Sequence, residues 1–171
     1  MHMTTLQRTL PVAHLAAADA LLVAAACLIP AASHLTAAPL YMLNPMLTLL
    51  LLGLLLGRRA GLQLLNGLVL AVAMPLLSSL LVGMPVVEKL PCMVAELAVV
   101  AGGYALLSRR MAALPAILLA ALAGKGVYYA LKALLMPAAT LVGTDWTVQL
   151  LALLLWGGLF ALAARRTESQ R

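Results

Sequence analysis

Charged side chains are scarce in this sequence. They make up 9% of its 171 residues, whereas hydrophobic residues make up 65%. A soluble domain of this length could not cover its surface with so little charge. Aromatic residues amount to only 4%, so the net positive charge has no stacking surface beside it of the kind that nucleic-acid binding requires. We therefore expect residues 1–171 to form a single membrane domain with no nucleic-acid partner.

Motifs for catalysis are also missing. The sequence contains no Gly-x-Ser-x-Gly, no His-Glu-x-x-His and no cluster of His and Cys at the spacing of metal ligands. A phosphate-binding glycine loop is absent too, so any work driven by ATP would have to be done by another chain. The two cysteines, Cys27 and Cys92, fall within or at the edge of apolar segments and are interpreted as buried thiols. These absences favour binding or transport over enzymatic activity, with no metal and no cofactor.

Arginine pairs end three of the long apolar stretches, and they lie at 58–59, 109–110 and 165–166. Lys and Arg collect in the cytoplasmic loops of membrane proteins, so each pair marks a return to the same side. The sequence between successive pairs has room for two helices of about 20 residues, the length that crosses a hydrocarbon core about 30 Å thick. The pairs predict an all-α bundle of six transmembrane helices with both termini cytoplasmic. They also predict a cytoplasmic face that attracts anionic lipid in the surrounding bilayer.

The spans follow from these directions. We expect them at 15–33, 40–57, 61–83, 91–107, 112–136 and 145–164. Pro75 lies inside the third span, where it removes one helical hydrogen bond and is expected to kink the helix. Residues 84–91 and 137–144 are then loops on the outer side.

Several polar residues interrupt these apolar spans. An ionisable group at the centre of a bilayer costs about 2.5–3.5 kcal/mol on insertion scales, so a helix that served only as an anchor would avoid them. By the directions above, most of them belong to the outer half: His34, Asn44, Glu96, Lys132, Asp145 and Gln149. Asp19 and Asn66 are the inner exceptions. Polar groups that converge from several helices in one leaflet are typical of a small-molecule cavity open to the outside.

Spacing on the last two spans supports such a cavity. Lys125, Tyr128, Tyr129 and Lys132 can share one face of the fifth helix. Trp146 and Gln149 fall within one turn of the sixth helix. The predicted substrate-binding residues are His34, Asn44, Glu96, Lys125, Tyr128, Tyr129, Trp146 and Gln149.

Each of these side chains also has a structural interpretation. Glu96 and Lys125 could form a buried ion pair with no ligand. Tyr128, Tyr129 and Trp146 could belong to an interfacial aromatic belt. Charged groups near the interface, including His34, Lys132 and Asp145, could extend their polar ends to water.

Small residues form a second pattern. Ala16, Ala20 and Ala24 repeat every four residues on the first span, and Gly53 and Gly57 do so on the second. Such stripes allow helices to approach closely, because packing drives helix association in lipid. Asn66 is interpreted in the same way, as a polar link between helices rather than a ligand.

Three stretches of the sequence resemble a known family. They are Ser33-His34-Leu35 followed by Asn44-Pro45-Met46 and the Leu-rich run to Leu56-Gly57-Arg58-Arg59-Ala60-Gly61; Met74-Pro75-Leu76-Leu77-Ser78-Ser79-Leu80-Leu81-Val82-Gly83-Met84-Pro85; and Glu96-Leu97-Ala98 with Gly102-Gly103-Tyr104. Together they resemble the first four helices of the substrate-binding S components of energy-coupling factor (ECF) vitamin transporters. The fifth and sixth spans match that family only in length and hydropathy.

The resemblance implies a prokaryotic protein of the cytoplasmic membrane that captures a water-soluble vitamin or vitamin precursor from outside. Its partners would be a transmembrane coupling subunit and two cytoplasmic ATPase subunits. Members of the family dock on the coupling subunit through small residues of the first helix, and Ala16, Ala20 and Ala24 stand where that stripe would be, with Asp19 as an unexpected neighbour.

A different class of function fits the same composition. The chain could be a small multi-pass scaffold or assembly protein of a larger membrane complex, with no ligand of its own. In that case its polar groups would satisfy one another or a partner.

Overall fold

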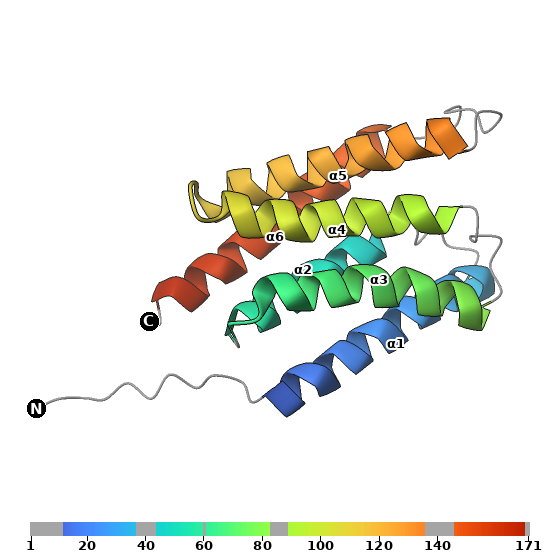
Figure 1. The fold of residues 1–171 in the computed structure, drawn as a ribbon, viewed down its shortest axis with the longest axis horizontal. Helices are drawn as coiled ribbons and strands as arrows, with labels where there is room; N and C mark the ends of the chain where they lie inside the picture. Colours follow the sequence, from blue (N-terminus) through green and yellow to red (C-terminus); the bar gives the residue numbers. More distant parts are fainter. Residues whose placement is uncertain (1–11, 37–43, 60, 83–88, 136–145, 170–171) are drawn as a thin grey trace, which may run out of the picture.

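The computed structural model describes residues 12–36, 44–59, 61–82, 89–135 and 146–169, and this part of the chain is almost entirely helical (Figure 1). The described residues form six helices: α1 (Val12–Thr36), α2 (Pro45–Arg59), α3 (Gln63–Val82), α4 (Leu90–Leu107), α5 (Ala113–Leu135) and α6 (Trp146–Ser169). They contain no strand. The expected all-α fold is confirmed.

Four of the described helices are long and apolar enough to cross a membrane. The qualifying segments are Val12–Ile29, Gln63–Leu81, Leu90–Leu107 and Ala113–Leu135. By contrast, α2 has 15 residues, fewer than the roughly 20 that a perpendicular span needs. The chain is therefore a multi-pass membrane protein by the character of its helices, while the crossing of all six remains a prediction.

The start of α2 corrects the expected start of the second span at residue 40. Asn44 has a φ of 51° and is not helical, so the helix begins at Pro45. Asn is one of the few residue types that adopt left-handed backbone readily, and Pro suits the first position of a helix because its missing N–H needs no partner there. Residues 40–43 lie outside the described residues. At the other end of the chain, α6 continues past the last arginine pair to Ser169, beyond the predicted end at 164.

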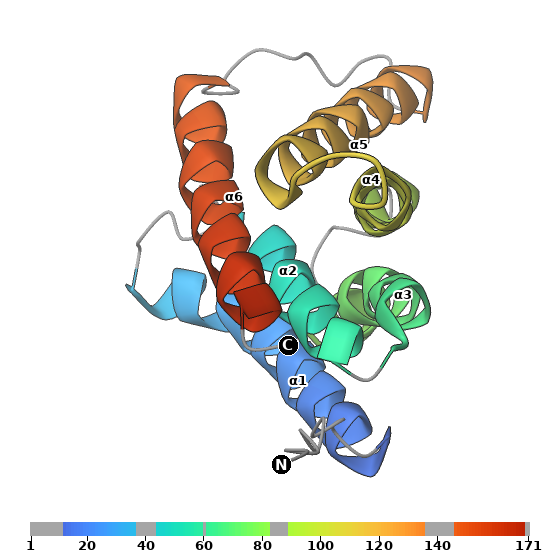
Figure 2. The same ribbon diagram turned by 90° about the vertical axis from the view of Figure 1, so that its left-hand side faces the viewer.

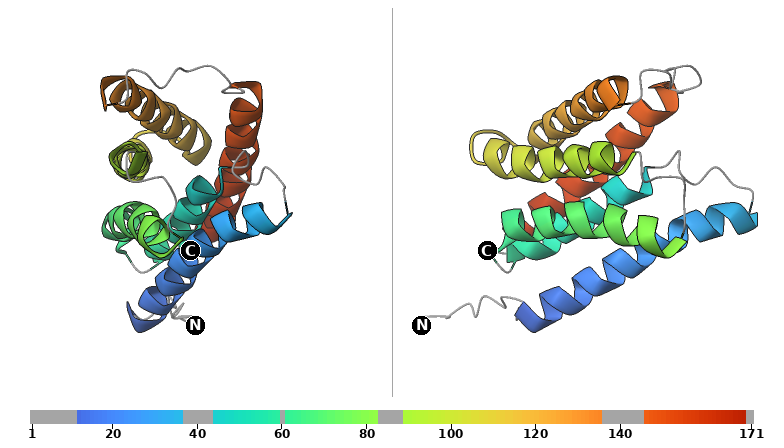
Figure 3. Two further views of the ribbon diagram at one scale, coloured as in Figure 1. Left: turned by 90° about the vertical axis from the view of Figure 1, so that its right-hand side faces the viewer. Right: turned by 45° about the vertical axis from the view of Figure 1, so that its right-hand side comes forward.

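The helices alternate in direction along the chain. Figure 1 shows the α2–α3 connection, the α4–α5 connection and the C-terminal end of α6 at the same end of the bundle, together with the start of α1. Because these are the places where the arginine pairs lie, we call this the arginine end. Seen along the bundle, α3, α4 and α5 form one row and α6, α2 and α1 a second (Figure 2), and the views of Figure 3 agree.

The core lies between the two rows. Leu50 and Leu54 from α2, Leu70 from α3 and Val100 from α4 are completely buried there. Tyr104 of α4 is also buried, and its ring meets that of Phe160 of α6 edge to face with 4.9 Å between the centroids. Such a contact joins α6 to the opposite row in a specific geometry.

The connection between α4 and α5 is tight. The backbone N–H groups of Arg110 and Met111 both donate to the carbonyl oxygen of Leu107, at 2.9 and 3.0 Å. α5 then begins at Ala113. The two helices consequently form an antiparallel hairpin with few residues between them.

Close packing of this hairpin depends on small residues that the sequence did not single out. Ala116, Ala120 and Gly124, here called the α5 stripe, are buried, and Cβ of Ala120 lies 3.2 Å from where a Cβ atom on Gly103 of α4 would be. A Cβ atom on Gly124 would lie 2.8 Å from both the carbonyl oxygen of Glu96 and Cγ2 of Val100. The α5 stripe therefore sets the separation of the two helices, in the manner of small-residue interfaces in membranes.

Ala16, Ala20 and Ala24, the α1 stripe, are in different surroundings. All three are exposed on the outside of the bundle, while α1 packs through another face, where Ser78 of α3 donates a hydrogen bond to the Ala26 carbonyl oxygen at 3.4 Å. Asp19 next to Ala20 belongs to that packed side, since one residue turns a helix by about 100°. Asp19 therefore takes part in packing within the bundle, whereas the α1 stripe beside it lies on the surface.

The pair Gly53 and Gly57 on α2 is used as the sequence predicts. Both are buried, and a Cβ atom on Gly57 would lie 2.9 Å from Cβ of Asn66 on α3. The glycines thus allow α2 and α3 to approach closely.

Candidate functional site

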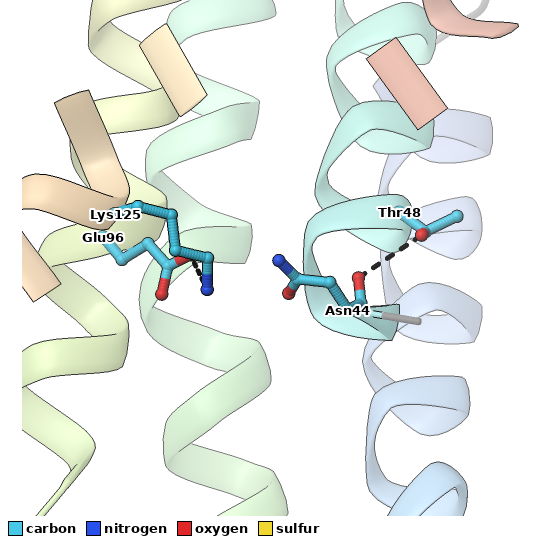
Figure 4. Close-up of polar contacts among 4 residues, drawn as sticks. All are labelled: Asn44, Thr48, Glu96 and Lys125. Carbon is cyan, nitrogen blue, oxygen red and sulfur yellow. Dashed lines mark hydrogen bonds and ion pairs between the residues drawn. The ribbon is translucent and has the colours of Figure 1, made fainter. Parts of the chain in front are cut away.

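Three of the predicted site residues line one cavity in the half of the bundle away from the arginine end. Asn44 precedes α2, Glu96 comes from the first turns of α4, and Lys125 comes from the middle of α5. Figure 4 shows the amide of Asn44 and the Glu96–Lys125 pair facing each other across the space between α2 and the α4–α5 hairpin. The helices thus bring together polar groups that are far apart in the sequence.

Glu96 and Lys125 form an ion pair. Lys125 Nζ lies 2.8 Å from Glu96 Oε1, and the side chains are 23% and 8% exposed respectively. The two sit on facing helices that Gly124 holds close together, since Gly124 contacts the Glu96 backbone. The sequence allowed these two residues to pair with each other or with a ligand. In the structure they are bonded to each other. Lys125 retains further donor capacity, because an ammonium group has three N–H bonds.

Two tyrosines extend the site along α5. Lys125 Nζ lies 5.3 Å from the centroid of the Tyr128 ring, within the range of a cation–π contact. The Tyr128 and Tyr129 rings meet edge to face, with 5.2 Å between centroids. Tyr128 accordingly contacts the ion pair, and Tyr129 contacts Tyr128.

Asn44 is held by its backbone. Its carbonyl oxygen accepts hydrogen bonds from the backbone N–H of Thr48 at 3.2 Å and from the Thr48 hydroxyl at 3.4 Å (Figure 4). These hydrogen bonds connect the first turn of α2 to Asn44, whose backbone is in the left-handed conformation. The backbone conformation thereby fixes the direction of the Asn44 Cα–Cβ bond.

Apolar residues make up the rest of the cavity wall. They are Leu47, Val100, Ala121, Leu122, Leu150 and Leu153. The sequence did not identify them, because nothing distinguishes these positions from the many other Leu, Ala and Val residues of the spans. Leu150 and Leu153 show that α6 supplies the fourth side.

The enclosed space is small. Its volume is about 50 Å³, enough for a few water molecules. Small-molecule sites usually measure about 300–1,000 Å³. The cavity formed by the described residues is therefore smaller than a typical small-molecule site.

The remaining predicted site residues are not brought to this cavity by the described part of the chain. His34 lies in α1, and Trp146 and Gln149 lie in the first turn of α6, but their side chains are outside the described structure. Asp145 and the predicted outer loop at 137–144 also lie outside it, as does most of the loop at 84–91. Participation of these residues in binding remains a prediction.

A second polar cluster lies nearer the arginine end, between α1, α2 and α3. The buried Asn66 side chain donates to the Gly53 carbonyl oxygen at 2.9 Å, and Gln63 donates to the Leu54 carbonyl oxygen at 3.3 Å. These bonds link α3 to α2, as expected for Asn66. Asp19 of α1 interacts with Asn66, and its Oδ1 atom is buried without a hydrogen bond from the described residues. We interpret this cluster as part of the helix packing.

Within the described ranges, no group of three or more His, Cys, Asp or Glu side chains is arranged to hold a metal ion. Both cysteines are free: Cys92 is buried and Cys27 half-buried. The polar groups that line the cavity are the Glu96 carboxylate, the Lys125 ammonium group and the Asn44 amide, which bind polar groups by hydrogen bonds and charge.

Comparisons of the chain with protein-family profiles, with curated proteins and with solved structures find no match.

Proposed function

We propose that this protein is the substrate-binding S component of an ECF-type importer, which captures a water-soluble vitamin or vitamin precursor from outside the cell. The observation that carries the proposal is the convergence of Asn44, Glu96 and Lys125 on one cavity away from the arginine end. A cavity that faces outward, opposite the cytoplasmic arginines, suits capture from outside. The pairing of a carboxylate with an ammonium group favours a substrate with an anionic or zwitterionic group.

Delivery of the substrate would require partners. The exposed α1 stripe offers a surface of small residues at which a coupling subunit could approach closely. Energy would come from two cytoplasmic ATPase subunits. In this proposal all six helices cross the bilayer and both termini are cytoplasmic.

The orientation has a direct test. A cysteine introduced by Arg59→Cys should react with a membrane-impermeant thiol reagent only after the membrane is opened. Labelling of Arg59→Cys from outside intact cells would overturn the proposed topology.

Binding is tested on the purified full chain with a panel of water-soluble vitamins and precursors, screened by native mass spectrometry and thermal shift. For a compound that binds, Asn44→Gly is the sharpest variant, since glycine keeps the left-handed backbone and removes only the amide. The loss of one neutral hydrogen bond should weaken affinity about two- to tenfold. Glu96→Gln should weaken it by more than tenfold, because charged partners buried with a ligand contribute about 2–5 kcal/mol.

Ser108→Gly serves as the matched control, since Ser108 lies at the arginine end of α4, away from the cavity. Its affinity should equal that of the native chain. Unchanged affinity in both Asn44→Gly and Glu96→Gln would place the binding site elsewhere.

One observation favours the second candidate, a scaffold protein without a ligand. Glu96 and Lys125 satisfy each other, and the cavity of about 50 Å³ has little room beside them. A scaffold would bind none of the compounds in the panel and would co-purify with a stable set of membrane proteins. Co-purification with a coupling subunit and paired ATPases favours the importer instead.

A further inference from the structure

An apolar groove runs between α2 and α6 on the outside of the bundle, separate from the polar cavity. Its volume is about 310 Å³, and its walls include Leu52 and Leu55 of α2 and Trp156, Leu159 and Ala163 of α6. Helix α6 contacts α2 along only part of its length and leans away from it elsewhere (Figures 2 and 3). With α2 and α6 in the bilayer, as the proposed topology has them, a space of this kind opens to lipid.

Each of the two helices that form the groove has an arginine at the arginine end, on the same face as the groove residues. Arg59 follows Leu55 by four residues on α2, and Arg166 follows Ala163 by three on α6. Residues at these spacings lie on the same face of a helix, so each arginine extends the lined face toward the membrane surface. Arg59 and Arg166 are exposed, and Figure 2 shows the ends of α2 and α6 next to each other.

The third arginine pair provides a comparison within the molecule. Arg109 and Arg110 lie at the same end and are exposed, but they follow α4, whose packing against α5 is closed by the α5 stripe. Positive charge is thus present at both places, whereas the combination of charge and an apolar groove occurs at α2 and α6.

From this combination we propose that the α2–α6 groove binds an anionic phospholipid of the inner leaflet. One acyl chain lies in the groove against Leu55 and Trp156, and Arg59 and Arg166 bind the phosphate of the headgroup. Basic residues beside a gap between transmembrane helices on the cytoplasmic side are suited to acidic headgroups, and guanidinium groups bind phosphate through paired hydrogen bonds. The inference rests on the six-span topology of the proposed function, and it is independent of the substrate of the polar cavity.

Tryptophan fluorescence provides the test. The chain has two tryptophans, so in a Trp146→Phe background Trp156 reports alone from the groove wall. The protein is reconstituted in phosphatidylcholine vesicles with a minor fraction of phosphatidylglycerol whose acyl chains carry bromine, a contact quencher. Quenching should exceed that given by the same fraction of brominated phosphatidylcholine in otherwise identical vesicles. Equal quenching by the two lipids would overturn the proposal.

Two double variants test which arginines are responsible for the preference for phosphatidylglycerol. Arg59→Gln with Arg166→Gln should reduce the apparent affinity for phosphatidylglycerol about fivefold for each arginine removed, and the matched control, Arg109→Gln with Arg110→Gln, should retain it. Equal loss in both double variants would assign the preference to the general charge of this end and overturn the groove site. Ala163→Leu fills the groove without changing charge, and it should reduce quenching by both lipids; unchanged quenching would place the acyl chain elsewhere.

Discussion

The α1 stripe and the α5 stripe have the same spacing of small residues, but they occupy opposite environments. The α5 stripe is buried against α4, where Gly124 leaves no space for a Cβ atom. The α1 stripe lies on the outer surface of the bundle. A small-residue repeat therefore permits close approach without specifying what approaches, and its partner is decided by the facing helix. For α5 this partner is α4, while the α1 stripe is exposed in the described part of the chain.

The largest expected effect of a substitution concerns the ion pair that the α5 stripe brings together. Lys125→Met removes the cation and leaves the less exposed Glu96 without a partner. Breaking a buried pair in this way costs about 3–5 kcal/mol, so thermal unfolding in detergent should occur at a clearly lower temperature. The double variant Glu96→Gln with Lys125→Met should recover much of that loss, since no buried charge remains.

Lys132→Met is the control for this prediction, because Lys132 lies two turns further along α5, near the end of the helix. It should unfold close to the native temperature. If Lys125→Met behaved like Lys132→Met, the ion pair would not contribute to the stability of the hairpin.

A smaller effect is expected when a side chain is added to the buried stripe itself. Gly124→Leu would push against the Glu96 carbonyl and Val100, and overpacking of this kind typically costs about 1–3 kcal/mol. Gly126→Leu, on the same helix, meets no atom within 4 Å of its new Cβ and should leave the melting temperature unchanged or slightly raised. Similar melting temperatures for the two variants would contradict the role assigned to the α5 stripe.

The smallest effect on stability is expected at the α1 stripe. Ala20→Trp should change the free energy of unfolding by no more than about 0.5 kcal/mol, as for a surface substitution away from special features. Ligand affinity should stay within the same range, while uptake in cells and co-purification with the coupling subunit should fall sharply. A variant that transports at the native rate would remove Ala20 from any interface, and a large loss of stability would make the α1 stripe part of the internal packing.

These two stripes also show what the sequence could and could not predict. Hydropathy and the arginine pairs predicted the positions of the six helices within a few residues for most of the chain. This was possible because the apolar composition of a helix is a property of its own stretch of sequence. Hydropathy did not predict the start of α2 at Pro45, because the left-handed backbone of Asn44 leaves no mark on the apolar composition of the span. Alanine is so frequent that spacing alone could not single out Ala116 and Ala120.

For the site, the useful signal was the depth of each polar residue in the membrane. The predicted directions of the helices placed Asn44 and Glu96 in the outer half of the membrane, and the spacing of the fifth span placed Lys125 on the face that carries Tyr128. The structure places Asn44, Glu96 and Lys125 at one cavity. The apolar walls could not be predicted, because a Leu that lines a cavity and a Leu that faces lipid have the same local sequence. The ion pair between Glu96 and Lys125 could not be predicted either, because it depends on the separation of α4 and α5. Gly124, the residue before Lys125, determines that separation.

The tight connection between α4 and α5 has a consequence for how the chain enters the bilayer. A charged group inserted alone costs up to about 2.5–3.5 kcal/mol, the value at the bilayer centre. Glu96 and Lys125, however, lie on neighbouring helices joined by a short turn. Contacts that are local in sequence can form early, so we expect the two helices to leave the translocon as a hairpin in which the charges already neutralise each other. In cell-free translation into microsomes, Lys125→Met should then lower the inserted fraction of α4, a helix that the substitution does not alter. Gly124 would thus assist biogenesis as well as stability.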